Sequence, residues 1–349
     1  MRKFDHVVIL SDGIRGHFHQ SLGIARCVCK ISGAKLEGEI IIPKLSSVKR
    51  FFVKLAARKN RLNLDLDNEI FARVRDFKNT LFISTGSSAA PYNISLARTT
   101  GNFCAVVMTP SILGTDPFDF AIVPEHDKHD SKAGNIFVTL GAPNHIDIQD
   151  LHEQAVAKFG NVNRERNHKV IALLIGGNDA NYGISPEFAA GIFANLREFR
   201  DCEFLITTSR RTGEATDKAV KNIFGNCDNV AYMLLASENP DENPVPAMLG
   251  AASHVLVTED SVSMVSESIT AGFRVGLIRV ERKTGFLKNA LGFGAKRFDE
   301  LFAEFSAMNL LEDLGDNPDF GKFLSAASQK HDSDFNEAMR AAKWILDLE

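Results

Sequence analysis

The sequence predicts an α/β protein made of two doubly wound, Rossmann-like domains. Short apolar runs bounded by Gly, Pro, Ser and Asn alternate with longer helical patterns along most of the chain, which is typical of repeated βα units around a parallel sheet. This series runs twice, with a polar stretch between the two halves. The length of 349 residues also fits two domains, each large enough to bury a core.

The first domain is expected over residues 1–150. Its predicted strands are short runs rich in Val, Ile, Leu and Phe, and its predicted helices carry apolar residues three and four positions apart. We expect the strands at His6–Leu10, Leu36–Ile42, Thr80–Ser84, Phe103–Met108, Phe120–Val123 and Ile136–Thr139. We expect the helices near Gln20–Ile31, Val48–Arg58, Glu69–Phe77 and Pro91–Thr100.

A polar, helix-prone stretch, Asp147–Phe159, leads to a second domain expected over residues 165–325. Its strands are expected at Lys169–Ile175, Glu203–Thr208, Asn229–Leu234, His254–Thr258 and Val275–Arg279. Its helices are expected near Pro186–Arg200, Glu214–Phe224, Val245–Ala251 and Val262–Ala271. The last segment, residues 332–349, has an apolar stripe at helical spacing, so we expect it to pack back onto the first domain as a helix.

The composition excludes several classes of protein. The 40 Lys and Arg against 44 Asp and Glu give a net charge of −4, whereas nucleic-acid binders are usually strongly basic. The five cysteines form neither a disulfide framework nor a metal-ligand pattern, so no metal site is expected. There is no signal-peptide core and no run near the ~18 apolar residues of a membrane span. We therefore expect a cytoplasmic protein whose only membrane contact would be peripheral, on the inner membrane.

The loop after the first predicted strand carries candidate catalytic residues, because ligands of doubly wound domains bind outside the carboxyl ends of the strands. Gly13 and Gly16 permit a tight turn, while Asp12 and His17 are titratable. The spacing lacks the G-x-G-x-x-G fingerprint of dinucleotide-binding folds. The alternative is that His17 simply caps or packs at the start of a helix.

Two further loops of the first domain are candidates. Thr85, Gly86 and Ser87 follow the third strand and open a helix, where backbone N–H groups suit an anion or an acceptor. The alternative is an ordinary βα turn with a serine cap. Glu125 and His126 follow another strand and place an acid beside a histidine.

The loops of the second domain predict a diphosphate site. A Gly-Gly turn lets backbone approach a ligand, arginines match phosphate oxygens, and serines at a helix N-terminus add hydroxyls to unpaired N–H groups. Glu267 lies farther along that helix, where it could reach ribose hydroxyls. The alternative is a capping serine, surface arginines and a solvated acid. The candidate residues are Gly176, Gly177 and Asn178 after the first strand, Ser209, Arg210 and Arg211 after the second, and Ser261, Val262, Ser263 and Met264 after the fourth.

The segment Ile40–Leu64 is basic and amphipathic. It contains no acidic residue, and its positive charges include Lys49, Arg50, Lys54 and Arg58, with Phe51 on the apolar stripe. This pattern is typical of a helix on an anionic membrane surface, which we expect residues 44–61 to contact. The alternative is a surface helix whose apolar stripe belongs to the core. No nucleic-acid partner is expected, because no exposed aromatics are interleaved in a groove pattern.

Several of these motifs together resemble the ELM family, which comprises plant mitochondrial-fission proteins and largely uncharacterised bacterial relatives. The resemblance spans about residues 5–280, and its most specific element is Ser261-Val-Ser-Met-Val-Ser-Glu267. The other motifs that carry it are Ser11-Asp-Gly with Gly16-His17 and Gln20-Ser-Leu-Gly23, Pro124-Glu-His-Asp127, Ile175-Gly-Gly177 and Thr207-Thr-Ser-Arg-Arg-Thr212.

The resemblance implies a GT-B fold, in which two Rossmann-like domains face each other across a cleft. It places the acceptor on the first domain and the nucleotide-sugar donor on the second, held by Gly177, Ser209, Arg210, Ser261, Ser263, Met264 and Glu267. It makes His17 the general base, with Asp12 beside it. Gly13, Gly16, Thr85, Gly86, Ser87, Glu125 and His126 then lie on the acceptor side. The chain departs from this pattern at Asp179, an acid where a small or hydroxyl residue would better suit phosphate.

Three hypotheses follow. The first is a metal-independent glycosyltransferase at the cytoplasmic membrane face, with a nucleoside diphosphate sugar as substrate and no cofactor. The second is a nucleotide-sugar epimerase of the same fold, and the third is a non-catalytic, membrane-associated protein. A dinucleotide-dependent oxidoreductase is disfavoured because neither domain has the glycine fingerprint. The donor, the acceptor, the stereochemical outcome and the oligomeric state are left open by the sequence.

Overall fold

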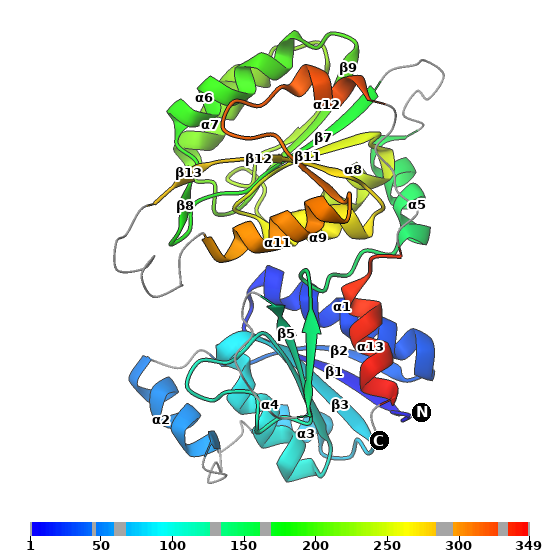
Figure 1. Ribbon diagram of the computed structural model, residues 1–349. Helices are drawn as coiled ribbons and strands as arrows, with labels where there is room; N and C mark the ends of the chain where they lie inside the picture. Colours follow the sequence, from blue (N-terminus) through cyan, green and yellow to red (C-terminus); the bar gives the residue numbers. More distant parts are fainter. Residues whose placement is uncertain are drawn as a thin grey trace. The chain divides into compact units, whose positions relative to one another are not determined.

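The structure, a computed structural model, describes residues 2–43, 47–58, 68–125, 134–160, 169–283, 296–326 and 334–347. The chain divides into two compact units. Unit 1 comprises Met1–His145 with Asn336–Glu349, and unit 2 comprises Ile146–Phe335. Each unit contains a six-stranded parallel sheet with helices on both faces (Figure 1). The predicted fold class, two Rossmann-like α/β domains, is therefore confirmed.

The sheet of unit 1 has the strand order β2-β1-β3-β4-β5-β6. The chain adds β2 on one side of β1 and then crosses back to add β3 on the other, so the switch in direction falls between β1 and β3. A crevice outside the carboxyl ends of such a strand pair is where doubly wound folds bind ligands. The elements are β1 (His6–Ser11), α1 (Arg15–Ser32), β2 (Lys35–Ile41), α2 (Ser47–Arg58), α3 (Asn68–Val74), β3 (Thr80–Thr85), α4 (Gly86–Thr100), β4 (Phe103–Val107), β5 (Phe120–Pro124), β6 (Ile136–Thr139) and α13 (Glu337–Asp347).

Alternating side chains of the central strands fill two separate cores in unit 1. Val7 and Ile9 of β1 pack in a cluster with residues of α1 and α13. Val8 and Leu10 pack in the other cluster, with residues of α4. Because successive side chains of a strand point to opposite faces, these runs of apolar residues bury both faces of the sheet.

Two helices of unit 1 begin earlier than the sequence predicted. Helix α1 starts at Arg15 rather than Gln20, and its N-cap residue Ile14 makes no side-chain cap, so no capping signal marks this start. Helix α4 starts at Gly86, and Pro91 lies inside it. Because proline favours the first helical turn, the sequence-based boundary fell at Pro91. The earlier starts bring His17 and Ser87 into the first turns of helices.

The sheet of unit 2 has the strand order β10-β9-β7-β11-β12-β14, and its direction switches between β7 and β11. Helices α6 and α7 lie on one face, and α8, α9 and α11 lie on the other (Figure 1). The elements are α5 (Ile148–Phe159), β7 (Lys169–Ile175), β8 (Tyr182–Gly183), α6 (Pro186–Phe193), the 3₁₀ helix η2 (Ala194–Glu198), β9 (Cys202–Thr208), α7 (Glu214–Phe224), β10 (Val230–Leu234), α8 (Val245–Ala251), β11 (His254–Thr258), α9 (Val262–Thr270), β12 (Val275–Ile278), β13 (Glu281–Arg282), α11 (Lys296–Ala307), β14 (Leu311–Asp313) and α12 (Phe320–Ser325).

Five elements of unit 2 were not predicted. They are the two-residue strands β8 and β13, which pair antiparallel in a separate ribbon, the short edge strand β14, and the helices α11 and α12 that flank it. The ribbon joins the loop after β7 to the loop after β12. Since β11 lies between these two strands in the sheet, the ribbon crosses over the carboxyl end of β11.

The boundary between the units falls before α5. Helix α5 packs against α8 and belongs to unit 2, whereas the sequence placed its first residues in the first domain. Gly250 of α8 shows how close this packing is, because a Cβ there would lie 2.0 Å from the carbonyl oxygen of Leu151. None of the helices in the described ranges combines the length and the apolar character that a bilayer span needs.

Candidate functional site

Asp12 and His17 form a hydrogen-bonded pair at the carboxyl end of β1. Nδ1 of His17 lies 3.0 Å from Oδ2 and 3.2 Å from Oδ1 of Asp12. The N–H of Ile14 donates to Asp12 Oδ1 at 3.1 Å, which further fixes the carboxylate. The Asp12 side chain is 7% exposed and that of His17 is 27% exposed. With Nδ1–H donating to Asp12, Nε2 of His17 keeps its lone pair and can accept a proton.

The start of α4 lies directly against His17. A Cβ on Gly86 would stand 2.9 Å from Cε1 of His17, and Gly86 has a φ of +76°, which side chains rarely adopt. The hydroxyl of Thr85 hydrogen-bonds to that of Ser21 at 2.8 Å and does not cap the helix. Ser87 Oγ accepts the N–H of Ser111 at 2.7 Å. The structure thus brings Thr85 and Gly86 next to the Asp12–His17 pair, as the neighbouring positions of β1 and β3 dictate.

The remaining candidates of the first domain are Gly13, Gly16, Glu125 and His126. Gly13 adopts a φ of +80° in the turn, and Gly16 lies in the first turn of α1. Glu125 follows β5 and is exposed. Because β5 is two strands beyond β3 in the sheet, Glu125 lies roughly 10 Å from the end of β3 along the same edge. His126 lies outside the described residues.

The Gly-Gly turn of unit 2 is filled by the protein itself. A Cβ on Gly176 would lie 2.1 Å from Oδ2 of Asp260, and a Cβ on Gly177 would lie 2.1 Å from the carbonyl carbon of Arg211. These two glycines therefore allow the loops after β7, β9 and β11 to pack against one another. In the sequence, the glycine pair predicted the close approach of a ligand, and the structure supplies an internal reason for both glycines.

Asp260 is the centre of this contact. Its Oδ2 accepts the N–H of Gly177 at 2.6 Å and Nη2 of Arg211 at 3.1 Å. Nη1 of Arg211 lies 3.7 Å from Oδ2 of Asp179. Burial raises the pKa of Asp260 to about 6, although the charge of Arg211 and the N–H of Gly177 work against this. Of the two adjacent arginines, Arg211 is the one held at the switch between β7 and β11.

The other residues predicted to bind the sugar nucleotide lie at the same edge of the sheet. Asn178 bonds the carbonyl of Thr212 and the N–H of Ile184, so it ties loops together. Ser209 Oγ accepts the N–H of Arg211 at 3.3 Å, and Arg210 is exposed. Ser261 is the N-cap of α9, yet its side chain makes no cap hydrogen bond. Val262, Ser263 and Met264 form the half-buried first turn of α9, and Glu267 lies in the second turn.

An ionic network that the sequence did not predict lies at the β8–β13 ribbon. The carboxylate of Glu259 is fully buried, and its Oε2 accepts Nη1 of Arg279 and Nη2 of Arg282, each at 2.7 Å. Asp299 binds both arginines as well. Hydrogen bonds to Asp299 and Glu259 raise the pKa of Arg282, and those from Arg282 lower that of Asp299. The signal was present, since Glu259 and Arg279 follow neighbouring strands.

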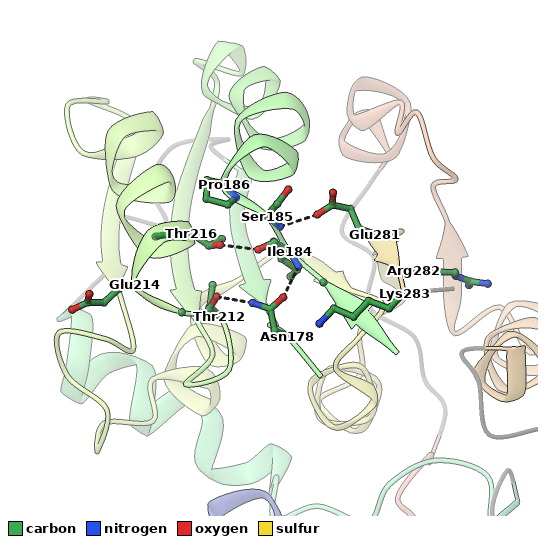
Figure 2. Close-up of a pocket in the computed structure, with 13 residues that line it drawn as sticks. Asn178, Ile184, Ser185, Pro186, Thr212, Glu214, Thr216, Glu281, Arg282 and Lys283 are labelled. Atoms are coloured by element: carbon green, nitrogen blue, oxygen red, sulfur yellow. Dashed lines mark hydrogen bonds between the residues drawn. The ribbon is translucent and has the colours of Figure 1, made fainter. Parts of the chain in front are cut away.

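A pocket of about 510 Å³ opens beside these loops, and Figure 2 shows its lining. Glu281 of β13 accepts the N–H of Ser185 at 2.8 Å, and the buried hydroxyl of Thr216 donates to the carbonyl of Ile184 at 2.7 Å. Asn178 and Thr212 line the pocket and also touch the glycine turn. The lining residues are Asn178, Gly183, Ile184, Ser185, Pro186, Thr212, Gly213, Glu214, Ala215, Thr216, Glu281, Arg282 and Lys283.

Only part of the basic segment is exposed at the surface of unit 1. In α2, Phe51 is 48% and Phe52 is 63% exposed. Lys54 is buried, and its ammonium donates to Ser111 Oγ at 2.9 Å. The prediction that Lys54 faces a membrane is therefore wrong, because its side chain points into unit 1. The side chains of Lys49, Arg50 and Arg58 lie outside the described part of the structure.

Comparisons with known proteins agree with this architecture. A family model described as mitochondrial fission ELM1 matches residues 15–348. The UDP-GlcNAc 2-epimerase from Methanocaldococcus jannaschii superposes with a TM-score of 0.57 at 12% identity, covering 97% of this chain and 98% of that chain. S. aureus MnaA, solved with UDP, has a TM-score of 0.54 at 11% identity, covering 99% of this chain and 95% of that chain.

The glycosyltransferase SnogD from Streptomyces nogalater has a TM-score of 0.53 at 13% identity, covering 99% of both chains. At such identities, these likenesses show the fold, a GT-B-like pair of Rossmann-like domains. No curated protein matched the chain.

Proposed function

The chain belongs to the mitochondrial fission ELM1 family, as its motifs predicted, and from this premise we propose that it is a metal-independent glycosyltransferase that uses a nucleoside diphosphate sugar. The observation that carries the proposal is the Asp12–His17 pair at the strand switch of unit 1. A histidine whose Nδ1 is fixed by a carboxylate is a suitable general base for an acceptor hydroxyl. The shared fold with solved nucleotide-sugar enzymes supports it.

In this proposal unit 2 binds the donor. Arg211 and the N-terminus of α9, which carries no side-chain cap, offer positive charge to the leaving diphosphate. The pocket of about 510 Å³ beside them lies in the size range of small-molecule sites. As the acceptor oxygen attacks the anomeric carbon, Nε2 of His17 takes its proton and the nucleoside diphosphate departs.

Binding is the first test. We expect at least one of a panel of UDP-, GDP-, CMP- and dTDP-linked sugars to raise the melting temperature of the protein and to release heat in calorimetry. Binding of none of them would contradict the proposal.

Turnover is the second test. His17→Ala should bind the same sugar nucleotide as the wild type but lose about 10²–10⁴-fold in transfer rate, the usual contribution of a general base. The matched control is His152→Ala, on the exposed side of α5. Equal loss in both variants would argue against a role for His17.

Epimerisation is the second candidate, because a UDP-GlcNAc 2-epimerase is among the solved proteins with this fold. An epimerase needs no acceptor. Conversion of a sugar nucleotide by the purified protein alone, followed by NMR, would favour this function over transfer.

Membrane association is the third candidate, supported by the exposed pair Phe51 and Phe52, whose rings meet edge to face at 5.7 Å. Exposed aromatics on a basic helix suit an anionic bilayer surface. Phe51→Ser/Phe52→Ser should reduce sedimentation with phosphatidylglycerol vesicles, whereas Ile148→Ser, which removes an equally exposed apolar side chain in α5, should not. Unchanged sedimentation of the double variant would exclude α2 as the contact.

A further inference from the structure

The three loops that follow β7, β9 and β11 meet at the carboxylate of Asp260. This side chain is fully buried, while that of Arg211 is 40% exposed. One carboxylate oxygen receives both the backbone N–H of Gly177, at 2.6 Å, and Nη2 of Arg211, at 3.1 Å. A carboxylate of the chain thus occupies the point where a backbone donor and a guanidinium converge.

This pair of donors is of the kind that binds phosphate oxygens, since a guanidinium and a loop N–H together give charge and direction. In unit 2 the anion between them is Asp260. The single positive charge of Arg211 also faces the carboxylate of Asp179. The charge of Arg211 is therefore already balanced by carboxylates of the chain, and an incoming diphosphate must compete with them.

The charge that is easiest to remove is the one on Asp260. Two charged groups of the described residues face it, Arg211 from the loop after β9 and Asp179 from the loop after β7. Burial outweighs the favourable effect of Arg211 and raises the pKa of Asp260 to about 6. Oδ1 is buried and has no close hydrogen-bond partner among the described residues. The hydroxyl of Thr258 favours the ionised form but does not offset burial.

We propose that Asp260 is an internal counter-anion for Arg211, which the phosphate of a bound nucleotide replaces while Asp260 takes up a proton from water. The inference rests on the proposed nucleotide binding and adds that this binding is coupled to protonation. No other bond forms or breaks. Phosphate affinity then falls as the pH rises above 6, by at most tenfold per pH unit.

Calorimetry with UDP tests this in the wild-type protein. Titrations between pH 7.5 and 8.5, where the second ionisation of the phosphate is complete, are repeated in buffers of different ionisation enthalpy. The dependence of the heat on the buffer counts the protons taken up. We expect an uptake close to one proton with UDP and none with uridine; no uptake with UDP would overturn the proposal without any variant.

Two variants localise the effect. Asp260→Asn keeps an acceptor for Gly177 but removes the charge, so at pH 8, two units above 6, it should bind UDP up to about a hundredfold more tightly and take up no proton. Arg211→Gln should bind UDP at least tenfold more weakly, whereas Arg197→Gln, an exposed arginine of η2, should bind normally. Equal or weaker binding by Asp260→Asn would show that the carboxylate positions the site and does not compete with the ligand.

Inorganic pyrophosphate separates this inference from the proposed function. If the protein binds no nucleotide, the same proton count and the same Asp260→Asn comparison are made with pyrophosphate. Binding of pyrophosphate with proton uptake would retain the counter-anion and reject the nucleotide. Binding of neither ligand would overturn both proposals.

Discussion

The position of His17 depends on the absence of a side chain at Gly86. The imidazole ring lies where a Cβ of residue 86 would project, and the backbone of Gly86 has a φ of +76°. One glycine therefore sets both the direction of α4 and the space for the candidate base. A substitution at Gly86 can therefore displace the candidate base, His17, without changing the charge of any side chain.

We expect Gly86→Ala to displace His17 and to reduce turnover at least tenfold, with little change in UDP binding. The left-handed backbone also costs an alanine about 1–2 kcal/mol in unfolding free energy. The measurements are steady-state rates and the NMR shift of the His17 ring proton on Cε1.

The control for this change is Gly101→Ala at the other end of α4. Gly101 also has a positive φ, +68°, but nothing lies within 4 Å of the added Cβ. It should lose similar stability and keep its turnover. If both variants lose turnover equally, strain in α4 and not contact with His17 is the cause.

A second residue-level prediction concerns pH. His254 of β11 is fully buried, Nδ1 lies 2.9 Å from Ser253 Oγ and Nε2 lies 3.2 Å from the carbonyl of Ala326. Burial lowers its pKa. The unfolded chain therefore binds a proton at His254 below about pH 6.5 that the folded chain does not, and stability is lost as the pH falls from there toward the folded pKa.

Urea denaturation of the wild type and of His254→Gln at pH 8 and pH 5.5 measures this contribution. The wild type should lose more stability between the two pH values than the variant does. An identical loss would assign the pH dependence to other groups.

The sequence could predict least well which residue of each loop points into the site. The glycine turn, the serine-rich start of α9 and the arginine pair were all found, because each directly follows a periodic apolar strand. Whether Arg210 or Arg211 turns inward depends on loop dihedrals, which have no sequence period. Asp260 was passed over because its neighbours Ser261 and Ser263 are better phosphate ligands, whereas packing against Gly176 decides its role.

At the level of elements, the β8–β13 ribbon depends on the ionic network beneath it. Glu259 accepts the N–H of Val280 at 2.9 Å in addition to its two arginines, so one carboxylate anchors the segment that leads into β13. Breaking a buried ion pair by removing one partner leaves the other charges uncompensated. The ribbon also forms one wall of the pocket.

We expect Glu259→Ala to lower the free energy of unfolding by about 3–5 kcal/mol, because Arg279 and Arg282 lose their buried partner. Glu198→Ala, which removes an exposed ion pair with Arg197, should cost at most about 1 kcal/mol. Urea denaturation measures both. Asp299 pairs with both arginines, and Asp313 pairs with Arg279 at 2.6 Å. Similar small losses in the two variants would show that these two carboxylates suffice without Glu259.

The elements that the sequence predicted are those in which apolar residues recur at a regular spacing over several residues. Strands β6, β7 and β11 and helices α7 and α8 have the predicted bounds. Strands β8, β13 and β14 are two or three residues long, too short for any periodicity to show. Their formation depends on partners far away in the sequence, such as Tyr182 opposite Arg282.

At the level of the whole molecule, unit 1 is completed by a helix from the far end of the chain. Ala338, Ala341, Ala342, Ile345 and Leu346 of α13 are buried in the same cluster as Ile24 and Val28 of α1. Glu337 accepts the N–H of Leu140 at 3.1 Å and pairs with Arg340. The apolar period of the segment predicted the packing of this helix, but not these anchoring bonds.

Deletion of residues 336–349 should therefore destabilise unit 1 and leave unit 2 folded. Hydrogen exchange should show faster exchange in β1 and β3 and unchanged protection in β7 and β11. Ile345→Ala alone should cost about 2–5 kcal/mol as a buried large-to-small change. Lys343→Ala, at an exposed position of the same helix, is its control.

The return of α13 also fixes an order of events during synthesis. All of unit 2 is made between β6 and α13, so unit 2 can fold on the ribosome while unit 1 still exposes the apolar face of α1. At a synthesis rate of about 5–20 residues per second, that face stays exposed for on the order of ten seconds or more before α13 packs against it. The nascent chain thus has an interval in which chaperones, rather than its own C-terminus, must protect its first domain.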